Sequence, residues 1–175
     1  MAKERLVIIC PGRGSYTRES SGYLNSKKNI ADREISWMNN QREATNLPTL
    51  NELDSSTFKS KIHMIGVNAS PLIYACSYVD FFSINKNKYE IVAITGNSMG
   101  WYTTLALSGV LTFQNAFKLI NVMSSLTKDD NGGQIIYPVV NENWQINDST
   151  YDMVLNEIEK VGACVSINLG GYIVI

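Results

Sequence analysis

The feature that most constrains the fold of this chain is a glycine-flanked serine between an apolar run and a helix-forming run. The segment Gly96-Asn-Ser-Met-Gly100 fits the pattern G-x-S-x-G. Residues 89–95 before it are typical of a buried β-strand, and residues 101–108 after it predict a helix. Small residues flank the serine because a tight strand-to-helix turn leaves no room for side chains. The context favours a nucleophile elbow that presents Ser98 over a glycine-rich turn with a capping serine.

Predicted strands alternate with predicted helices along the first two thirds of the chain. Residues 6–10 indicate a buried strand that runs into a glycine-rich loop. We expect Ser70 and Pro71 to start a helix, because serine caps free N–H groups and proline is tolerated at the first helical position. Thr112 is expected to cap another helix. The alternation predicts an α/β core with a parallel sheet that is covered on both faces.

A second, smaller unit is expected after the cluster of Asp, Asn and Gly at residues 128–133. Its expected elements are a strand, a helix and two further strands, at residues 134–140, 149–161, 163–167 and 172–175. We therefore divide the chain into an incomplete core, residues 1–127, and a smaller unit, residues 128–175. The last run reaches Ile175 inside an expected strand, whose unpaired edge would favour association.

Composition narrows the possible partners and compartments. Fifteen basic and sixteen acidic residues give a net charge of −1 without a block of like charge, so a nucleic-acid partner is not expected. No stretch resembles a signal peptide or a membrane span, so we expect a cytoplasmic protein with no membrane partner. The three cysteines, Cys10, Cys76 and Cys164, are widely spaced and lie in apolar surroundings. We expect them to be free and buried, with no disulfide and no metal site.

Three segments of the chain, in this order, carry a specific resemblance. They are Pro11-Gly-Arg-Gly-Ser15, the elbow with the residues that follow it up to Ile120, and the run from Val165 to Ile175. Together they resemble the malonyl-CoA:acyl carrier protein transacylases and the acyltransferase domains of polyketide synthases. The corresponding family patterns are a Pro-Gly-Gln-Gly-Ser loop, a Gly-His-Ser-Leu-Gly-Glu-Tyr elbow and an Asn followed by a Val-Ile strand. The resemblance implies a hydrolase-like parallel-sheet core and part of a small ferredoxin-like subdomain.

The resemblance also implies a mechanism. Ser98 would attack the thioester of an acyl-CoA, and the phosphopantetheine thiol of an acyl carrier protein would then attack the acyl-serine ester. The backbone N–H groups of Met99 and Arg13 would form the oxyanion hole. The glycines of the elbow and of the loop would be Gly96, Gly100, Gly12 and Gly14. Acyl-CoA and an acyl carrier protein are the implied partners, and no cofactor or metal is needed.

Three pocket positions depart from the family pattern. Asn97 stands where the family has histidine, and Trp101 stands where it has glutamate. In the family an arginine selects malonyl groups. Counted from the elbow without gaps, the corresponding position in this sequence is Met123. Methionine cannot pair with a carboxylate, whereas arginine does so through a planar fork. A neutral acyl group is therefore expected in place of malonyl.

The general base of the family does not match any residue of this sequence. The single histidine, His63, precedes Ser98, and we expect it to be a surface or packing residue. We therefore expect a truncated form of a longer enzyme, or a second chain that supplies the base. Two alternatives stay open. One is a serine esterase or thioesterase on the same elbow, and the other is a non-catalytic acyltransferase-like protein that binds a carrier or synthase.

Overall fold

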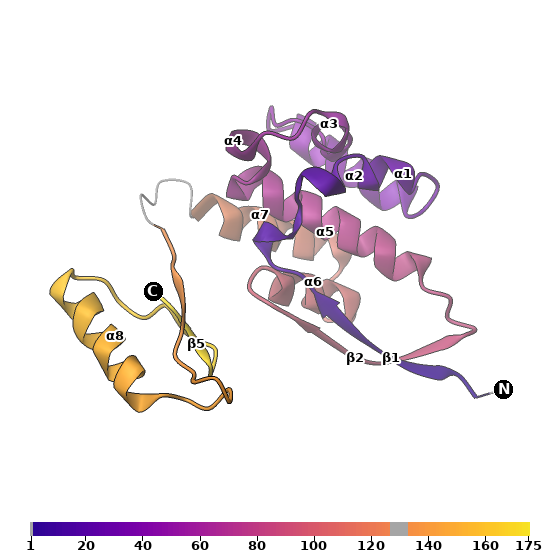
Figure 1. Ribbon diagram of the computed structural model, residues 1–175. Helices are drawn as coiled ribbons and strands as arrows, with labels where there is room; N and C mark the ends of the chain where they lie inside the picture. The colour runs from indigo at the N-terminus through magenta and orange to yellow at the C-terminus, as the bar shows by residue number, and fades with distance from the viewer. Residues whose placement is uncertain (1, 127–132) are drawn as a thin grey trace. The chain divides into compact units, whose positions relative to one another are not determined.

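The computed structural model describes residues 2–126 and 133–175, which belong to two compact units (Figure 1). The larger unit is Met1–Asp129 and the smaller one is Asp130–Ile175. The boundary predicted at residues 128–133 lies, except for Gly133, outside the described residues.

The larger unit combines a small parallel sheet with helices. Strands β1 (Glu4–Cys10) and β2 (Tyr89–Gly96) pair in parallel, with Cys10 opposite Gly96. Two 3₁₀ turns, η1 (Arg13–Ser15) and η2 (Arg18–Ser20), follow β1. The helices are α1 (Tyr23–Ser26), α2 (Asp32–Glu43), α3 (Leu50–Ser55), α4 (Ser60–His63), α5 (Gly66–Ser83), α6 (Gly100–Leu107) and α7 (Phe113–Leu126). The mixed α/β architecture and the parallel pairing confirm the sequence prediction at that level.

The sheet is covered on one face only. Leu6 and Ile8 point toward the helices and are half-buried, and Cys10 is fully buried. Their neighbours on the opposite face are open, since Val7 is 53% exposed and Ile9 is 71% exposed. In Figure 1 the helices of this unit lie on one side of the β1–β2 ribbon. The prediction of strands covered on both faces is therefore wrong for the described residues.

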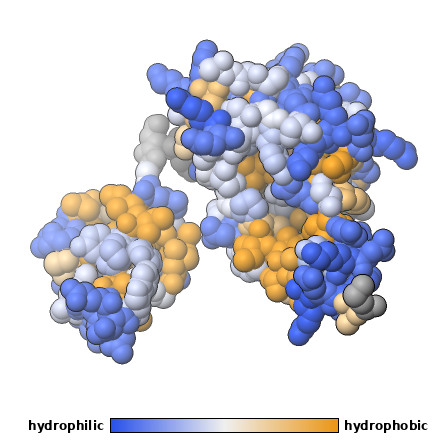
Figure 2. Space-filling view, turned by 45° about the vertical axis from the view of Figure 1, so that its right-hand side comes forward, coloured by the Kyte–Doolittle hydropathy of each residue, from blue (hydrophilic) through white to orange (hydrophobic). Residues whose placement is uncertain are grey.

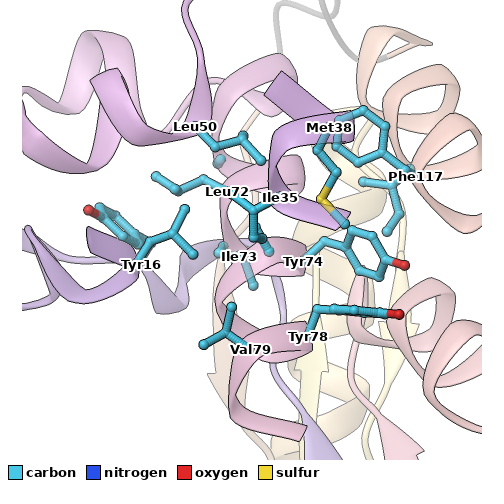
Figure 3. Close-up of a cluster of buried hydrophobic side chains, with 14 of the residues drawn as sticks. Tyr16, Ile35, Met38, Leu50, Leu72, Ile73, Tyr74, Tyr78, Val79 and Phe117 are labelled. Carbon is cyan, nitrogen blue, oxygen red and sulfur yellow. The ribbon is translucent and has the colours of Figure 1, made fainter. Parts of the chain in front are cut away.

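Helix α5 forms the centre of the hydrophobic core of the larger unit. Its side chains Leu72, Ile73, Tyr74 and Val79 are at most 2% exposed, which explains its nearly continuous apolar sequence. Residues of α2, α3, α7 and the loop after β1 pack around it (Figure 3). The buried residues shown in Figure 3 include Tyr16, Ile35, Met38, Leu50, Tyr78 and Phe117. The core therefore depends on residues 68–79 of α5, which contain all of its buried side chains.

Helix α5 begins at Gly66, four residues before the predicted start at Ser70. Pro71 consequently lies inside the helix, where it has no N–H to donate to the carbonyl of Val67. The guanidinium of Arg42 takes over this role, because its Nη1 donates to the Val67 oxygen at 2.8 Å. The prediction that Ser70 caps this helix is therefore wrong. The helix continues through Pro71 because Arg42, which is distant in sequence, donates to the Val67 carbonyl that proline leaves without a donor.

Arg42 is a buried cation held by neutral acceptors. It is 1% exposed, and its Nη2 donates to the Asn68 side-chain oxygen at 2.6 Å. Its Nε donates to the Pro48 carbonyl, so one side chain joins α2, the loop before α3 and the first turn of α5. Burial lowers the pKa of Arg42 to about 10, which leaves it charged at neutral pH. The three bonds compensate the loss of water around the charge.

The smaller unit is an antiparallel sheet with one helix. It contains β3 (Ile136–Pro138), α8 (Asp148–Lys160), β4 (Ile167–Asn168) and β5 (Tyr172–Val174). The strand order is β3-β5-β4. The hydrophobic core of this unit consists of Val139, Val154 and Ile173. The strands are shorter than predicted, and the helix matches its predicted range within one residue. Because β5 is the central strand, the prediction of an unpaired edge at the C-terminal run is wrong.

The cap of α7 agrees with the sequence prediction, whereas one of the cysteines does not. Thr112 caps α7 as predicted, since its Oγ1 accepts from the Asn115 N–H at 3.2 Å. Cys10 is buried and Cys76 is largely so, but Cys164 is exposed, which contradicts the prediction of three buried thiols. Cys164 lies in the loop after α8, where neighbouring apolar residues do not fold over it. All three cysteines are free.

The Arg42–Val67 contact predicts a coupled effect of two substitutions. Arg42→Met should lower the free energy of unfolding by about 3 kcal/mol, because buried acceptors lose their donor. Pro71→Ala restores a helical N–H for the Val67 carbonyl. In the Pro71→Ala protein, Arg42→Met should therefore lower the free energy of unfolding by about 1 kcal/mol less than it does in the wild type. Urea denaturation of the four variants of this cycle measures the coupling. Additive effects would contradict the assigned role of the guanidinium.

Candidate active site

Ser98 lies at a sharp turn between β2 and α6, as the sequence predicted. It is exposed, and its φ of 53° places it in the left-handed region, which non-glycine residues rarely adopt. The turn is closed by the Gly100 N–H, which donates to the Asn97 carbonyl at 2.8 Å. The Trp101 N–H donates to the Ser98 carbonyl at 3.0 Å and starts the helix. Such backbone strain is held by surrounding packing and is often found at functional sites.

The two glycines of the motif are required by close backbone contacts. A Cβ atom on Gly96 would lie 2.3 Å from the carbonyl atoms of Gly100. A Cβ atom on Gly100 would lie 2.2 Å from the carbonyl oxygen of Cys10. Both distances are far inside van der Waals contact, and the atoms met are main-chain atoms that cannot turn aside. The elbow therefore depends on glycine at both positions.

The loop after β1 lies directly beside the elbow. The Asn97 N–H donates to the Cys10 carbonyl at 3.0 Å, which extends the pairing of β1 and β2 into the turn. A Cβ atom on Gly12 would lie 3.3 Å from the Ser98 Cβ. The structure thus brings together two sequence motifs that are more than 80 residues apart. Gly14 differs from Gly12, because a Cβ there would meet nothing within 4 Å.

The geometry around Ser98 offers backbone donors. Met99 precedes the first residue of α6, where N–H groups have no intrahelical acceptor and carry the positive end of the helix dipole. Its side chain is buried and contacts the Thr103 hydroxyl, so the Met99 main chain is firmly positioned. Arg13 follows Gly12 and opens η1. An oxyanion hole built from the Met99 and Arg13 N–H groups agrees with this arrangement and stays a prediction.

The three predicted pocket residues lie in different settings. Asn97 is exposed next to Ser98, and Trp101 is 58% exposed on the first turn of α6. Met123 is half-buried near the end of α7. Asn97 and Trp101 therefore belong to the surroundings of the serine, whereas the place of Met123 in a pocket rests on the sequence argument alone.

His63 is a packing residue. It is 1% exposed at the end of α4 and stacks on Phe58, with ring centroids 5.0 Å apart. Its Nε2 lies 3.0 Å from the Leu53 carbonyl, and its Nδ1 accepts from the Lys59 N–H at 3.0 Å. Both ring nitrogens are thus engaged in local bonds. Among the described residues, no side chain forms a hydrogen bond with the Ser98 hydroxyl, and His63 is not its base.

The thiol next to the site is not a competing nucleophile. Cys10 ends β1, and burial raises the pKa of its thiol above the ordinary value. Burial also raises the pKa of Cys76 to about 12. A thiol must lose its proton to attack a thioester, so burial disfavours the reactive form of both cysteines. Among residues 2–126 and 133–175, no cluster of histidine, cysteine and acidic residues could hold a metal ion.

Sequence reasoning missed two contributors to the elbow. The Thr104 hydroxyl donates to the Gly100 carbonyl at 2.9 Å, and its oxygen closes the space beside Gly96. The Cys10 carbonyl accepts from the elbow itself. The spacing of Thr104 four residues after Gly100 could have indicated the first contact. The second depends on the strand register, which the sequence does not reveal.

Comparison with known proteins gives matches at the level of structure. No protein-family profile matches the chain, and no curated protein matches it. The acyl-carrier-protein S-malonyltransferase of Bartonella henselae superposes with a TM-score of 0.68 at 15% identity, over 97% of this chain and 54% of that one. The corresponding enzyme of Burkholderia pseudomallei gives a TM-score of 0.66 at 18% identity, with coverage of 98% and 54%.

A third structure is a type II polyketide-synthase acyl carrier protein in complex with its malonyl-transacylase. It matches with a TM-score of 0.70 at 18% identity, over 98% of this chain and 54% of that one. This chain has the acyltransferase fold. It spans about half the length of these acyltransferase structures, and at such low identity the likeness establishes the fold alone.

No helix in the described part of the acyltransferase fold is long and apolar enough to cross a membrane.

The glycine contacts predict a sharp contrast between two glycine-to-alanine substitutions. Gly100→Ala should lower the free energy of unfolding by about 2 kcal/mol or more, because main-chain atoms must move to admit the methyl group. Gly14→Ala, which meets nothing, should change it by less than about 0.5 kcal/mol. Chemical denaturation of the two variants measures the difference. Equal effects would show that the elbow is not packed as described.

The left-handed conformation of Ser98 predicts that glycine at position 98 would give a more stable protein than a residue with a Cβ atom. Ser98→Gly should be about 1 kcal/mol more stable than Ser98→Ala, because only alanine keeps the penalty of a positive φ. Thermal unfolding compares the two variants. A more stable alanine variant would mean that Ser98 does not adopt this conformation in solution.

Proposed function

We propose that this chain carries the nucleophilic part of an acyltransferase that moves an acyl group from acyl-CoA to an acyl carrier protein. In this reaction the Ser98 hydroxyl attacks the thioester carbonyl, coenzyme A leaves with its sulfur, and an acyl-Ser98 ester remains. The phosphopantetheine thiol of the carrier then attacks the ester and restores the serine. The reaction needs no cofactor, and the protein is proposed to be cytoplasmic.

One observation carries the proposal: an exposed, strained Ser98 next to a helix start and next to the Gly12 loop. An ester-forming serine needs an exposed oxygen and donors for the negative charge that develops on the substrate carbonyl. The Met99 and Arg13 main chains are the proposed donors. The acyltransferase fold of the matched structures supports this chemistry over a simple glycine turn.

The general base is proposed to come from outside these 175 residues. His63 is buried and bonded to the Leu53 and Lys59 main chains, so it is not available to Ser98. Loss of the base from a serine triad costs about four orders of magnitude or more in rate, and binding and the oxyanion hole keep a residual activity. The chain alone should therefore react slowly.

The acyl group is proposed to be neutral. Met123 replaces the cation that would hold a free carboxylate, and it lies half-buried on α7. A thioether offers an apolar surface and no charge. Acetyl or a longer acyl chain fits such a residue better than malonyl. Asn97 and Trp101 are proposed to line the same pocket.

The two units are proposed to be parts of larger domains. Residues 1–127 would belong to a hydrolase-like parallel-sheet core, which the β1–β2 pair and its helices support. Residues 128–175 would belong to a ferredoxin-like subdomain, which the β3-β5-β4 sheet and α8 support. The chain is accordingly proposed to be a truncated form.

The proposal predicts an acyl adduct on Ser98 that an added base accelerates. The chain is incubated with malonyl-, acetyl- or octanoyl-CoA, with and without imidazole, and its intact mass is measured. Imidazole should raise the rate of adduct formation at least tenfold, because it supplies the missing general base. Acetyl- or octanoyl-CoA should react faster than malonyl-CoA.

The matched control for this experiment is Ser98→Ala, which should give no adduct on the elbow peptide under any of these conditions. An adduct that persists in Ser98→Ala would come from another nucleophile. Absence of a Ser98-dependent adduct with all three thioesters and imidazole would contradict the catalytic proposal.

A second candidate is a non-catalytic protein of the same fold that binds an acyl carrier protein. The lack of a hydrogen-bond partner for the Ser98 hydroxyl among the described residues favours it. This candidate predicts binding of a holo carrier protein with equal affinity by the wild type and Ser98→Ala, and no acyl adduct on either. Calorimetric titration together with the mass measurement separates the two candidates.

A further inference from the structure

The larger unit contains a cavity of about 520 Å³ between α2, α7 and the first turn of α5, which we name the α2–α7 cavity. Its lining comes from these three helices and from the loop after α2, and it includes Arg42, Val67, Phe117, Lys118 and Val122. Neither the elbow at residues 96–100 nor Met123 belongs to this lining. The α2–α7 cavity is therefore separate from the site around Ser98.

The charges at the α2–α7 cavity are all positive. Arg42 is 1% exposed and Lys118 is exposed, and the described lining contains no aspartate or glutamate. The hydrogen bonds of Arg42 go to neutral oxygens of Pro48, Val67 and Asn68. A guanidinium has five N–H donors, so one on Nη1 and one on Nη2 have no acceptor within residues 2–126 and 133–175. The buried positive charge thus has no counter-ion in the described part of the chain.

Most of the remaining wall of the α2–α7 cavity is apolar. Leu47, Val67, Phe117 and Val122 contribute to it, and Val122 is 57% exposed. Sites for small molecules commonly have about 300–1,000 Å³ of space and combine an apolar wall with a few polar groups. An inorganic anion would leave the apolar wall uncovered, and a neutral apolar molecule would leave the buried cation unpaired. The lining therefore favours a ligand that has both an anionic group and an apolar body.

A second cavity of the larger unit, of about 530 Å³, has a similar size but the opposite charge. It runs along β1, and Figure 2 shows hydrophobic surface gathered on the lower part of this unit, near the N-terminal strand. Leu6 and Ile9 are part of its apolar lining. Its described lining contains the carboxylate of Asp80 and neither lysine nor arginine. An anion with an apolar body should therefore prefer the α2–α7 cavity, because the cavity along β1 repels its charge.

We propose that the α2–α7 cavity binds a small amphiphilic carboxylate, in which a single carboxylate is attached to a hydrocarbon chain of medium length. The two carboxylate oxygens accept from the remaining N–H groups of Arg42 and pair with the Lys118 ammonium. The hydrocarbon chain lies against Phe117 and Val122. This binding site goes beyond the acyl transfer proposed for Ser98 and does not depend on it.

Calorimetric titration of the 175-residue chain with three probes tests both parts of this recognition. The probes are octanoate, 1-octanol and inorganic phosphate. We expect octanoate to bind with 1:1 stoichiometry and at least tenfold more tightly than 1-octanol, which has the same hydrocarbon chain without the charge. Inorganic phosphate has the charge without the chain, and it should also bind at least tenfold more weakly than octanoate.

Two glutamate substitutions locate the bound octanoate. Val122→Glu adds a carboxylate to the wall of the α2–α7 cavity and should weaken octanoate binding at least tenfold. Ile9→Glu adds the same charge to the wall of the cavity along β1 and should change the affinity less than twofold. Val122 is 57% exposed and Ile9 is 71% exposed, so neither change removes a core side chain. Circular dichroism verifies that both variants are folded.

Two lysine substitutions test the charge of the site. Lys118→Gln removes the ammonium at the cavity and should weaken octanoate binding at least threefold, without an effect on 1-octanol. Lys61→Gln is the matched control, because Lys61 is exposed on α4 and does not line the cavity. It should change octanoate affinity less than 1.5-fold. Ser98→Ala should bind octanoate as the wild type does, so failure of the acyl-transfer proposal would not affect this result.

Four results would overturn the proposal. The first is that octanoate does not bind, or binds no more tightly than 1-octanol. The second is that inorganic phosphate binds as tightly as octanoate. The third is that Ile9→Glu weakens octanoate binding as much as Val122→Glu does, which would assign the ligand to the cavity along β1. The fourth is that Lys118→Gln leaves octanoate binding unchanged.

Discussion

The close contact between the Cys10 carbonyl and Gly100 is the constraint on which the rest of the site depends. A Cβ atom on Gly100 would lie 2.2 Å from that oxygen, so α6 can start only where glycine lets β1 approach. The Asn97 N–H then bonds to the same carbonyl at 3.0 Å and fixes the register of the loop and the turn. This register places Gly12 beside Ser98. The strain at Ser98 is held by these backbone contacts and not by its own side chain.

The same register links the site to the stability of the whole larger unit. The sheet rests on α6 and, through it, on the core around α5. That core is anchored by Arg42, which bonds the carbonyl that Pro71 leaves free. A buried arginine and an internal proline are each unfavourable alone, and they are compatible because each compensates the other. The face of the sheet that carries Val7 and Ile9 is open among the described residues, so the helices stabilise the sheet from one side.

The sequence predicted the parts of this structure that depend on local patterns. The elbow followed from glycines around Ser98 between a strand and a helix, and Thr112 was identified as a cap from the residues after it. The parallel pairing followed from the alternation of strands and helices. Prediction from the sequence failed where a residue distant in the chain determines the local structure. The start of α5 depends on Arg42, and the central place of β5 depends on β3 and β4. The contact of Gly12 with Ser98 required the strand register, which local patterns do not contain.

The claim that this fold performs acyl transfer is tested most directly by the fate of an acyl group already on Ser98. Protein loaded with a labelled acyl group is freed of acyl-CoA and mixed with holo acyl carrier protein or with the apo form, which lacks the phosphopantetheine thiol. The account predicts that label lost from Ser98 appears on the holo carrier and that the apo carrier receives none. Loss of label as free acid at the same rate with either carrier would contradict it and would indicate a hydrolase.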